Sequence, residues 1–132
     1  MSMEDKTSIK KVEQFNKSFG LTINKNPKVL SESESELKFT LMQEELFEYK
    51  DACKNNNLIE IVDAIVDMQY ILDGIKLAHG IQDSFDVLFD EVHQSNMSKL
   101  ENGKVLKRND GKILKGKNYF EPDLKKILKK WI

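Results

Sequence analysis

Apolar side chains recur every three or four positions over most of the chain, which is the spacing of amphipathic α-helices. Segment 5–19 has this spacing, and Gly20 suits the left-handed position that follows a helix. The same spacing predicts helices from Ser31, Ser33 or Ser35 to about Lys54, over 57–78 and over 82–98. The apolar positions of the four segments are Ile9, Val12, Phe15, Phe19; Leu37, Leu41, Leu46, Phe47; Leu58, Ile61, Val62, Ile65, Met68, Leu72; and Phe85, Leu88, Phe89, Val92, Met97.

The connections suggest how these helices are arranged. Residues 55–57 are three asparagines, a turn short enough to make the flanking helices antiparallel. Residues 104–115 predict a β-hairpin around Asp110-Gly111, and residues 122–131 a terminal helix that begins with proline. We therefore predict an all-α fold, with a four-helix antiparallel core, a short C-terminal β-hairpin and a terminal helix, as a single domain over residues 1–132.

Acidic residues gather at helical spacing on the second and third predicted helices. Glu45-x-x-Glu48 and Glu60-x-x-Asp63 each place two carboxylates about 60° apart on a helix face, and Glu44 and Asp67 extend the two clusters. No Lys or Arg occurs from Asn55 to Ile75, so the third helix lacks the basic partners that usually accompany exposed acidic residues. A divalent cation held by carboxylate oxygens is the expected countercharge.

An ordinary solvated helix face is the alternative interpretation of these carboxylates. Two observations argue against it: the missing basic partners, and the residues that continue the stripe of the third helix. Tyr70, Ile71 and Gly74 lie further along that stripe, and a face that meets only water would not be expected to carry them. The pattern therefore favours a metal site over a solvated face.

Composition excludes several classes of protein. No apolar run reaches the roughly 18 residues of a membrane span, and the N-terminal stretch 1–6 lacks the apolar segment of a signal peptide. Cys53 is the single cysteine, which excludes an internal disulfide, makes a structural zinc site improbable and indicates the cytoplasm. We expect no membrane association.

The net charge of −1 conceals an asymmetry along the chain. Residues 1–98 carry 10 Lys/Arg against 18 Asp/Glu, whereas residues 99–132 carry 11 against 4. On charge alone, the basic segment is either a solvated terminus that binds nucleic acid weakly or a partner for polyphosphate near the acidic helices.

The acidic motifs resemble those of the all-α nucleoside triphosphate pyrophosphohydrolases, which include MazG-like proteins and phosphoribosyl-ATP pyrophosphohydrolase. The resemblance rests on Glu44-Glu45-x-x-Glu48 and Glu60-x-x-Asp63, and it continues through residues 63–74, 93–99 and 110–123. Only eleven residues separate Glu48 from Glu60, which fits a minimal turn and disfavours the dUTPase type with its longer insert.

The resemblance implies a Mg²⁺-dependent enzyme, with Mn²⁺ as a possible substitute, that releases pyrophosphate from a nucleoside triphosphate or a related nucleotide such as phosphoribosyl-ATP. It implies Glu45, Glu48, Glu60, Asp63 and Asp67 as metal ligands and Glu44 and Glu45 as catalytic residues. It also implies a homodimer or homotetramer.

Asn96 and Lys99 lie three residues apart and share a helix face. The resemblance favours contacts of Lys99 with the phosphate and of Asn96 with the sugar or base; the alternative is a lysine that complements the dipole at the helix end. Lys112 and Lys115 are further candidates for phosphate binding. With a nucleotide as the expected substrate, nucleic acid is not expected as a partner. A non-catalytic helical module that binds metal or nucleotide is the alternative function.

Overall fold

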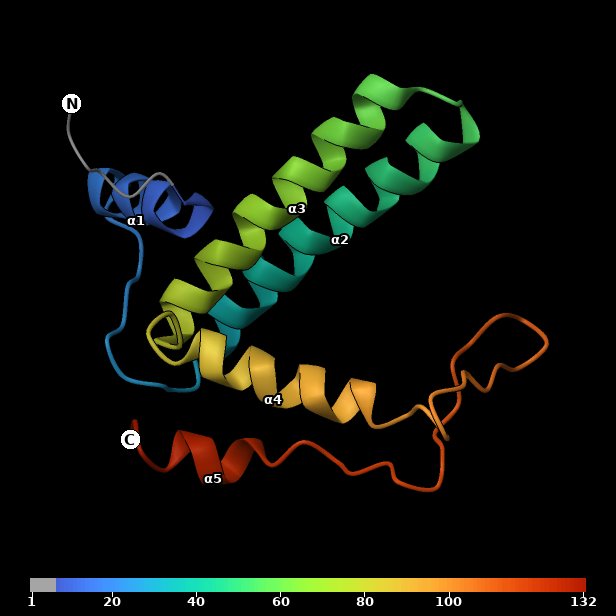
Figure 1. The fold of residues 1–132 in the computed structure, drawn as a ribbon. Coiled ribbons are helices and arrows are strands. Elements are labelled where there is room, and N and C mark those ends of the chain that lie inside the picture. The colour runs from blue at the N-terminus through green and yellow to red at the C-terminus, as the bar shows by residue number, and fades with distance from the viewer. Residues whose placement is uncertain (1–6) are drawn as a thin grey trace, which may run out of the picture. The chain divides into compact units, whose positions relative to one another are not determined.

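Five α-helices are present in residues 7–132, the part of the chain that the computed structural model describes (Figure 1). The chain divides into two units, the first ending at Gln82 and the second beginning at Asp83. The described residues form helices and no strand, which confirms the predicted all-α class. The N-terminal stretch 1–6, including the start predicted for the first helix at position 5, lies outside the described residues. The single domain over 1–132 and the four-helix antiparallel core stay predictions.

Helix α1 (Ser8–Phe19) packs against α3 (Leu58–His79). Val12 is 2% exposed, and the ring of Phe15 meets that of Tyr70 edge-on, with 5.5 Å between the centroids. Gly20 has a φ of 69° and donates its backbone N–H to the carbonyl of Asn16, so it ends the helix as predicted.

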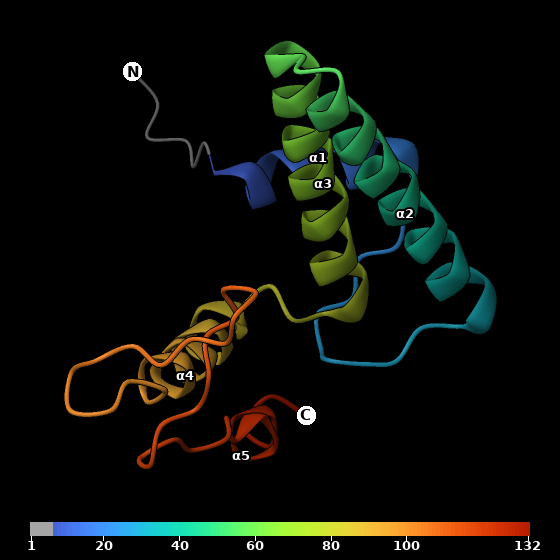
Figure 2. The same ribbon diagram turned by 90° about the vertical axis from the view of Figure 1, so that its right-hand side faces the viewer.

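Helix α2 (Glu32–Lys54) and α3 form a hairpin, and both views show the two helices side by side (Figures 1 and 2). Ser31 caps α2 by accepting a hydrogen bond from the backbone N–H of Glu34 at 3.3 Å. Asn57 caps α3 in the same way, accepting from the N–H of Glu60 at 3.1 Å. Asn56 adopts a φ of 50° between them, a conformation that asparagine tolerates. The predicted turn is therefore as short as the sequence indicated.

The connection from α1 to α2 is fastened to the end of α3. Asn24 donates a side-chain hydrogen bond to the carbonyl of Ala78 at 2.7 Å, and a ring nitrogen of His79 lies 2.8 Å from the carbonyl oxygen of Lys28. Gly80 has a φ of 71°, and a Cβ there would lie 2.1 Å from the carbonyl oxygen of Asn26. Glycine is therefore required at position 80 both by the backbone conformation and by this close approach.

The second unit contains α4 (Phe85–Met97) and α5 (Leu124–Leu128). Its C-terminal segment is tied to α4 by two hydroxyl groups: Ser95 donates to the carbonyl of Phe120 at 2.7 Å, and Ser98 accepts from its N–H at 3.1 Å. The terminal helix is shorter than the predicted 122–131. The side chain of Asp123 accepts from the N–H of Lys126 and caps its start, and the helix ends at Leu128.

The predicted β-hairpin is wrong. Residues 104–115 contain no strand; a single antiparallel bridge joins Lys107 to Ile113 across a turn that includes Gly111. Arg108 and Asp110 hydrogen-bond each other within this turn. The segments on either side of the turn are short and exposed, and no other segment of the described residues pairs with them. The turn alone is therefore not enough to stabilise a β-ladder.

No helix in residues 7–132 combines the length and the apolar character needed to cross a membrane.

Candidate functional site

Three carboxyl groups of the α2–α3 hairpin converge. Glu45 and Glu48 lie one turn apart on α2, and Asp67 belongs to α3. One oxygen from each residue lies within 4.8 Å of the others. The tight turn at residues 55–57 and the Asn57 cap together determine where α3 begins, and hence which of its residues faces Glu45.

The pKa of Glu45 is raised from 4.5 to about 7. Burial is the first cause, because a carboxylate loses hydration there; hydrogen bonding to Glu48 and the charges of Glu48, Asp67 and Asp63 follow. Burial, with the charges of Asp63 and Glu48, also raises the pKa of Asp67. The cluster therefore opposes its own ionisation near neutral pH.

These carboxyl groups lack a countercharge, which a cation could supply. The Oε2 atom of Glu45 is buried and has no hydrogen-bond partner in residues 7–132. Glu48 can bond to Glu45 only while one of the two carries a proton, so full ionisation leaves them repelling each other. None of the ion pairs in the described residues involves Glu45, Glu48 or Asp67. An all-oxygen donor set without an internal countercharge fits a hard divalent cation.

A second hollow of about 370 Å³ adjoins this cluster on the same two helices. Glu48, Asp51, Glu60 and Asp63 line it. Glu48 belongs to both groups, so the two groups of carboxylates adjoin each other on α2 and α3. We call their six residues the acidic groove: Glu45, Glu48, Asp51, Glu60, Asp63 and Asp67.

The structure thus brings all five predicted metal ligands to the acidic groove, in two overlapping groups. Their role as ligands stays a prediction. Glu44 is exposed and belongs to neither group, so its predicted catalytic role rests on the resemblance alone. Asp51 was missed by the sequence analysis, although Glu45, Glu48 and Asp51 follow one another at intervals of three residues. That repeated spacing was the available signal.

The predicted substrate-binding residues Asn96, Lys99, Lys112 and Lys115 all lie in the second unit. Asn96 is exposed at the end of α4, and Lys115 places its ammonium 4.6 Å from the centre of the Tyr119 ring. That these residues bind substrate stays a prediction.

The raised pKa of Glu45 predicts an unusual pH dependence for the metal-free chain. Between pH 4.5 and about 7 the folded chain keeps a proton on Glu45 that the unfolded chain has lost, so the free energy of unfolding falls as the pH rises through this window. The Glu45→Gln variant removes this fall. In chelator-treated samples it should melt several degrees above the parent at pH 8 and close to it at pH 4.5. The exposed Glu36→Gln, on the same helix, is the matched control, and an unchanged pH slope in Glu45→Gln would contradict the account.

Comparison with known proteins finds one curated relative and one matching family model. A stretch of 82 residues, 59% of this chain, is 35% identical to an uncharacterized protein of Acanthamoeba polyphaga mimivirus. The matched stretch covers 33% of that protein, so the chain spans about a third of the curated relative. The family model described as phosphoribosyl-ATP pyrophosphohydrolase matches residues 12–96, which include α2, α3 and the whole acidic groove. The chain therefore belongs to the phosphoribosyl-ATP pyrophosphohydrolase family.

Proposed function

We propose that this chain is a Mg²⁺-dependent pyrophosphohydrolase that cleaves a nucleoside triphosphate, or a related nucleotide, to the monophosphate and pyrophosphate. The observation that carries the proposal is the convergence of Glu45, Glu48 and Asp67, with a buried carboxylate oxygen that has no partner in the described residues. Family membership supports a pyrophosphohydrolase activity on a nucleotide.

The acidic groove would hold the cation through carboxylate oxygens. Glu45, Glu48, Glu60, Asp63 and Asp67 are the proposed ligands, and Mn²⁺ is compatible with the same oxygens. Bound there, the cation would offset phosphate charge and make a coordinated water more acidic. Lys99, Lys112 and Lys115 would contact phosphate, and Asn96 the sugar or base.

The carboxyl groups also supply a proton acceptor. A water oxygen forms a bond to phosphorus while the bond from phosphorus to the oxygen of the leaving pyrophosphate breaks. Glu45 would take up the proton of that water as an ionised carboxylate, a state that a cation bound beside it would favour over the protonated form. Glu44 would orient the water.

A second copy of the chain is proposed to cover the apolar surface that the hairpin leaves open. Phe47 on α2 is 57% exposed, and Ile59 and Val66 on α3 are 78% and 57% exposed. Such side chains on long helices are typical of oligomer interfaces. A homodimer or homotetramer would bury them.

Loss of a proposed ligand should abolish turnover. Incubated with Mg²⁺ and a panel of nucleoside triphosphates, the parent should release pyrophosphate, and Glu48→Gln and Asp63→Asn should reduce the rate at least about a hundredfold. The exposed Glu36→Gln on α2 should retain the parent rate. If no nucleotide yields pyrophosphate but Mg²⁺ still raises the melting temperature of the parent, the chain is a binding module and the catalytic proposal is wrong.

The oligomer is tested by light scattering on variants that place a charge in the apolar surface. Phe47→Lys and Val66→Lys should shift the mass of the parent assembly toward the 15.3 kDa monomer, because burying an unpaired ammonium is costly. Val29→Lys, at an 87% exposed position in the connection before α2, should leave the mass unchanged. A monomeric parent would contradict the proposal.

A further inference from the structure

Every residue from Leu124 to Ile132 is either a lysine or a large apolar residue. Lysines occupy positions 125, 126, 129 and 130, and leucine, isoleucine or tryptophan occupies the other five. In a helix, where each residue advances about 100°, this order separates the two kinds of side chain onto opposite faces of about 140° each. We call residues 124–132 the lysine-rich segment.

The structure maintains these two faces beyond the end of α5. The helix itself ends at Leu128, but the backbone N–H of Lys129 still donates to the carbonyl of Lys125 at 3.1 Å. The N–H of Trp131 then donates to the carbonyl of Leu128 at 2.9 Å. Helical turns therefore continue to Trp131, and the lysine-rich segment is amphipathic in the structure as well as in the sequence.

The lysine side chains of the segment have no countercharge. All four are exposed, and none of the ion pairs in the described residues involves them. The carboxylate of Asp123 accepts a hydrogen bond from the backbone N–H of Lys126 at 3.1 Å, so it caps the helix. Four ammonium groups thus face solvent within six residues, which favours an anionic partner.

The apolar face of the segment is only partly covered. Helix α5 packs against α4, and Ile127 and Leu128 in the middle of the segment are half-buried (Figure 1). Toward the two ends, Leu124 is 36% exposed, Trp131 38% and Ile132 78%. The segment therefore presents apolar atoms beside its ammonium groups, and tryptophan next to lysine is a combination that suits the interface between a membrane and water.

The shape of the segment favours a flat partner. A groove in another protein would have to enclose the apolar face, part of which α4 already occupies. Nucleic acid could use the lysines, but bases stack on aromatic rings and gain little from the aliphatic Leu124 and Ile132. At a lipid surface, headgroup phosphates attract the ammonium groups while Trp131 and Ile132 enter the boundary of the acyl chains.

We propose that the lysine-rich segment binds the surface of a membrane that contains anionic lipids. This binding goes beyond the proposed function and does not depend on it. The expectation of no membrane association rested on the lack of a spanning segment and of a signal peptide, and neither is needed for attachment at the surface.

Sedimentation with lipid vesicles tests the proposal on the full chain. The protein should sediment with vesicles of equal parts phosphatidylcholine and phosphatidylserine, and it should stay in solution with vesicles of phosphatidylcholine alone. Salt should release it, because the Debye length falls from about 10 Å at 0.1 M to about 3 Å at 1 M. Trp131 is the single tryptophan, so its emission should move to shorter wavelength when the anionic vesicles bind.

Two double variants separate the lysine-rich segment from the general positive charge of the second unit. Lys125→Glu combined with Lys129→Glu should weaken binding to the anionic vesicles at least about thirtyfold. Lys104→Glu combined with Lys107→Glu makes the same change of charge at exposed positions before α5 and should bind nearly as the parent does. Both variants should keep the parental melting temperature, because all four positions are exposed.

Four results would overturn the proposal. The first is equal binding to both kinds of vesicle or to neither, and the second is equal loss of binding in the two double variants. The third is a single-stranded oligonucleotide that shifts the Trp131 emission at a lower phosphate concentration than the anionic vesicles do. The fourth is a lower mass of the Lys125→Glu/Lys129→Glu variant in light scattering, which would mean that a second copy of the chain covers the segment.

Discussion

Mutual repulsion among the carboxyl groups of Glu45, Glu48 and Asp67 is the constraint around which the first unit is organised. One oxygen from each lies within 4.8 Å of the others, and the pKa of Glu45 rises to about 7 as a result of burial and of its acidic neighbours. Only a rigid support can hold like charges so close. That support is the α2–α3 hairpin, whose helices begin at the Ser31 and Asn57 caps and are joined by a three-residue turn.

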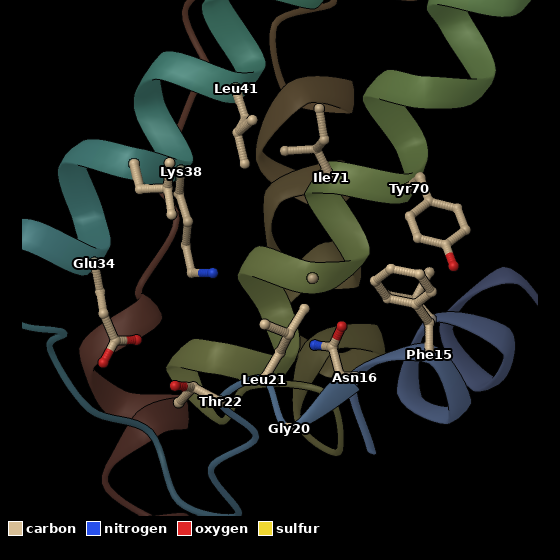
Figure 3. A pocket seen from close by; sticks show the side chains of 13 residues that line it. Phe15, Asn16, Gly20, Leu21, Thr22, Glu34, Lys38, Leu41, Tyr70 and Ile71 are labelled. Atoms are coloured by element: carbon tan, nitrogen blue, oxygen red, sulfur yellow. The ribbon is translucent and has the colours of Figure 1, made fainter. Parts of the chain in front are cut away.

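The first unit contains two hollows of different character. Carboxylates line one of them, at Glu48, Asp51, Glu60 and Asp63, and a larger cavity lined mostly by apolar side chains opens among α1, α2 and α3 (Figure 3). The family model covers residues 12–96, which include every residue that lines the two hollows.

The sequence predicted those parts of the structure that depend on local chemistry. Ser31 was one of the three serines expected to begin the second helix, Gly20 ends the first helix as predicted, and the acidic spacing was enough to indicate the groove. Tyr70, Ile71 and Gly74 were correctly judged unsuited to a solvated face, since all three line the cavity. The prediction of a β-hairpin at 104–115 was wrong because a turn sequence does not determine whether the flanking segments pair as strands. The burial of Asn16 was overlooked because it comes from the packing of α1 on α3, a long-range contact that periodicity does not encode.

The central claim is that a divalent cation supplies the countercharge that these carboxylates lack. Anomalous diffraction from a crystal of the protein grown with Mn²⁺ tests it most directly, because Mn²⁺ prefers the same oxygen ligands and its position is read without reference to activity. We predict a strong peak between α2 and α3, bounded by carboxylate oxygens of Glu45, Glu48 and Asp67 or of the adjoining Glu60 and Asp63. A saturated crystal with no peak in the acidic groove, or with Mn²⁺ bound only elsewhere, would contradict the account.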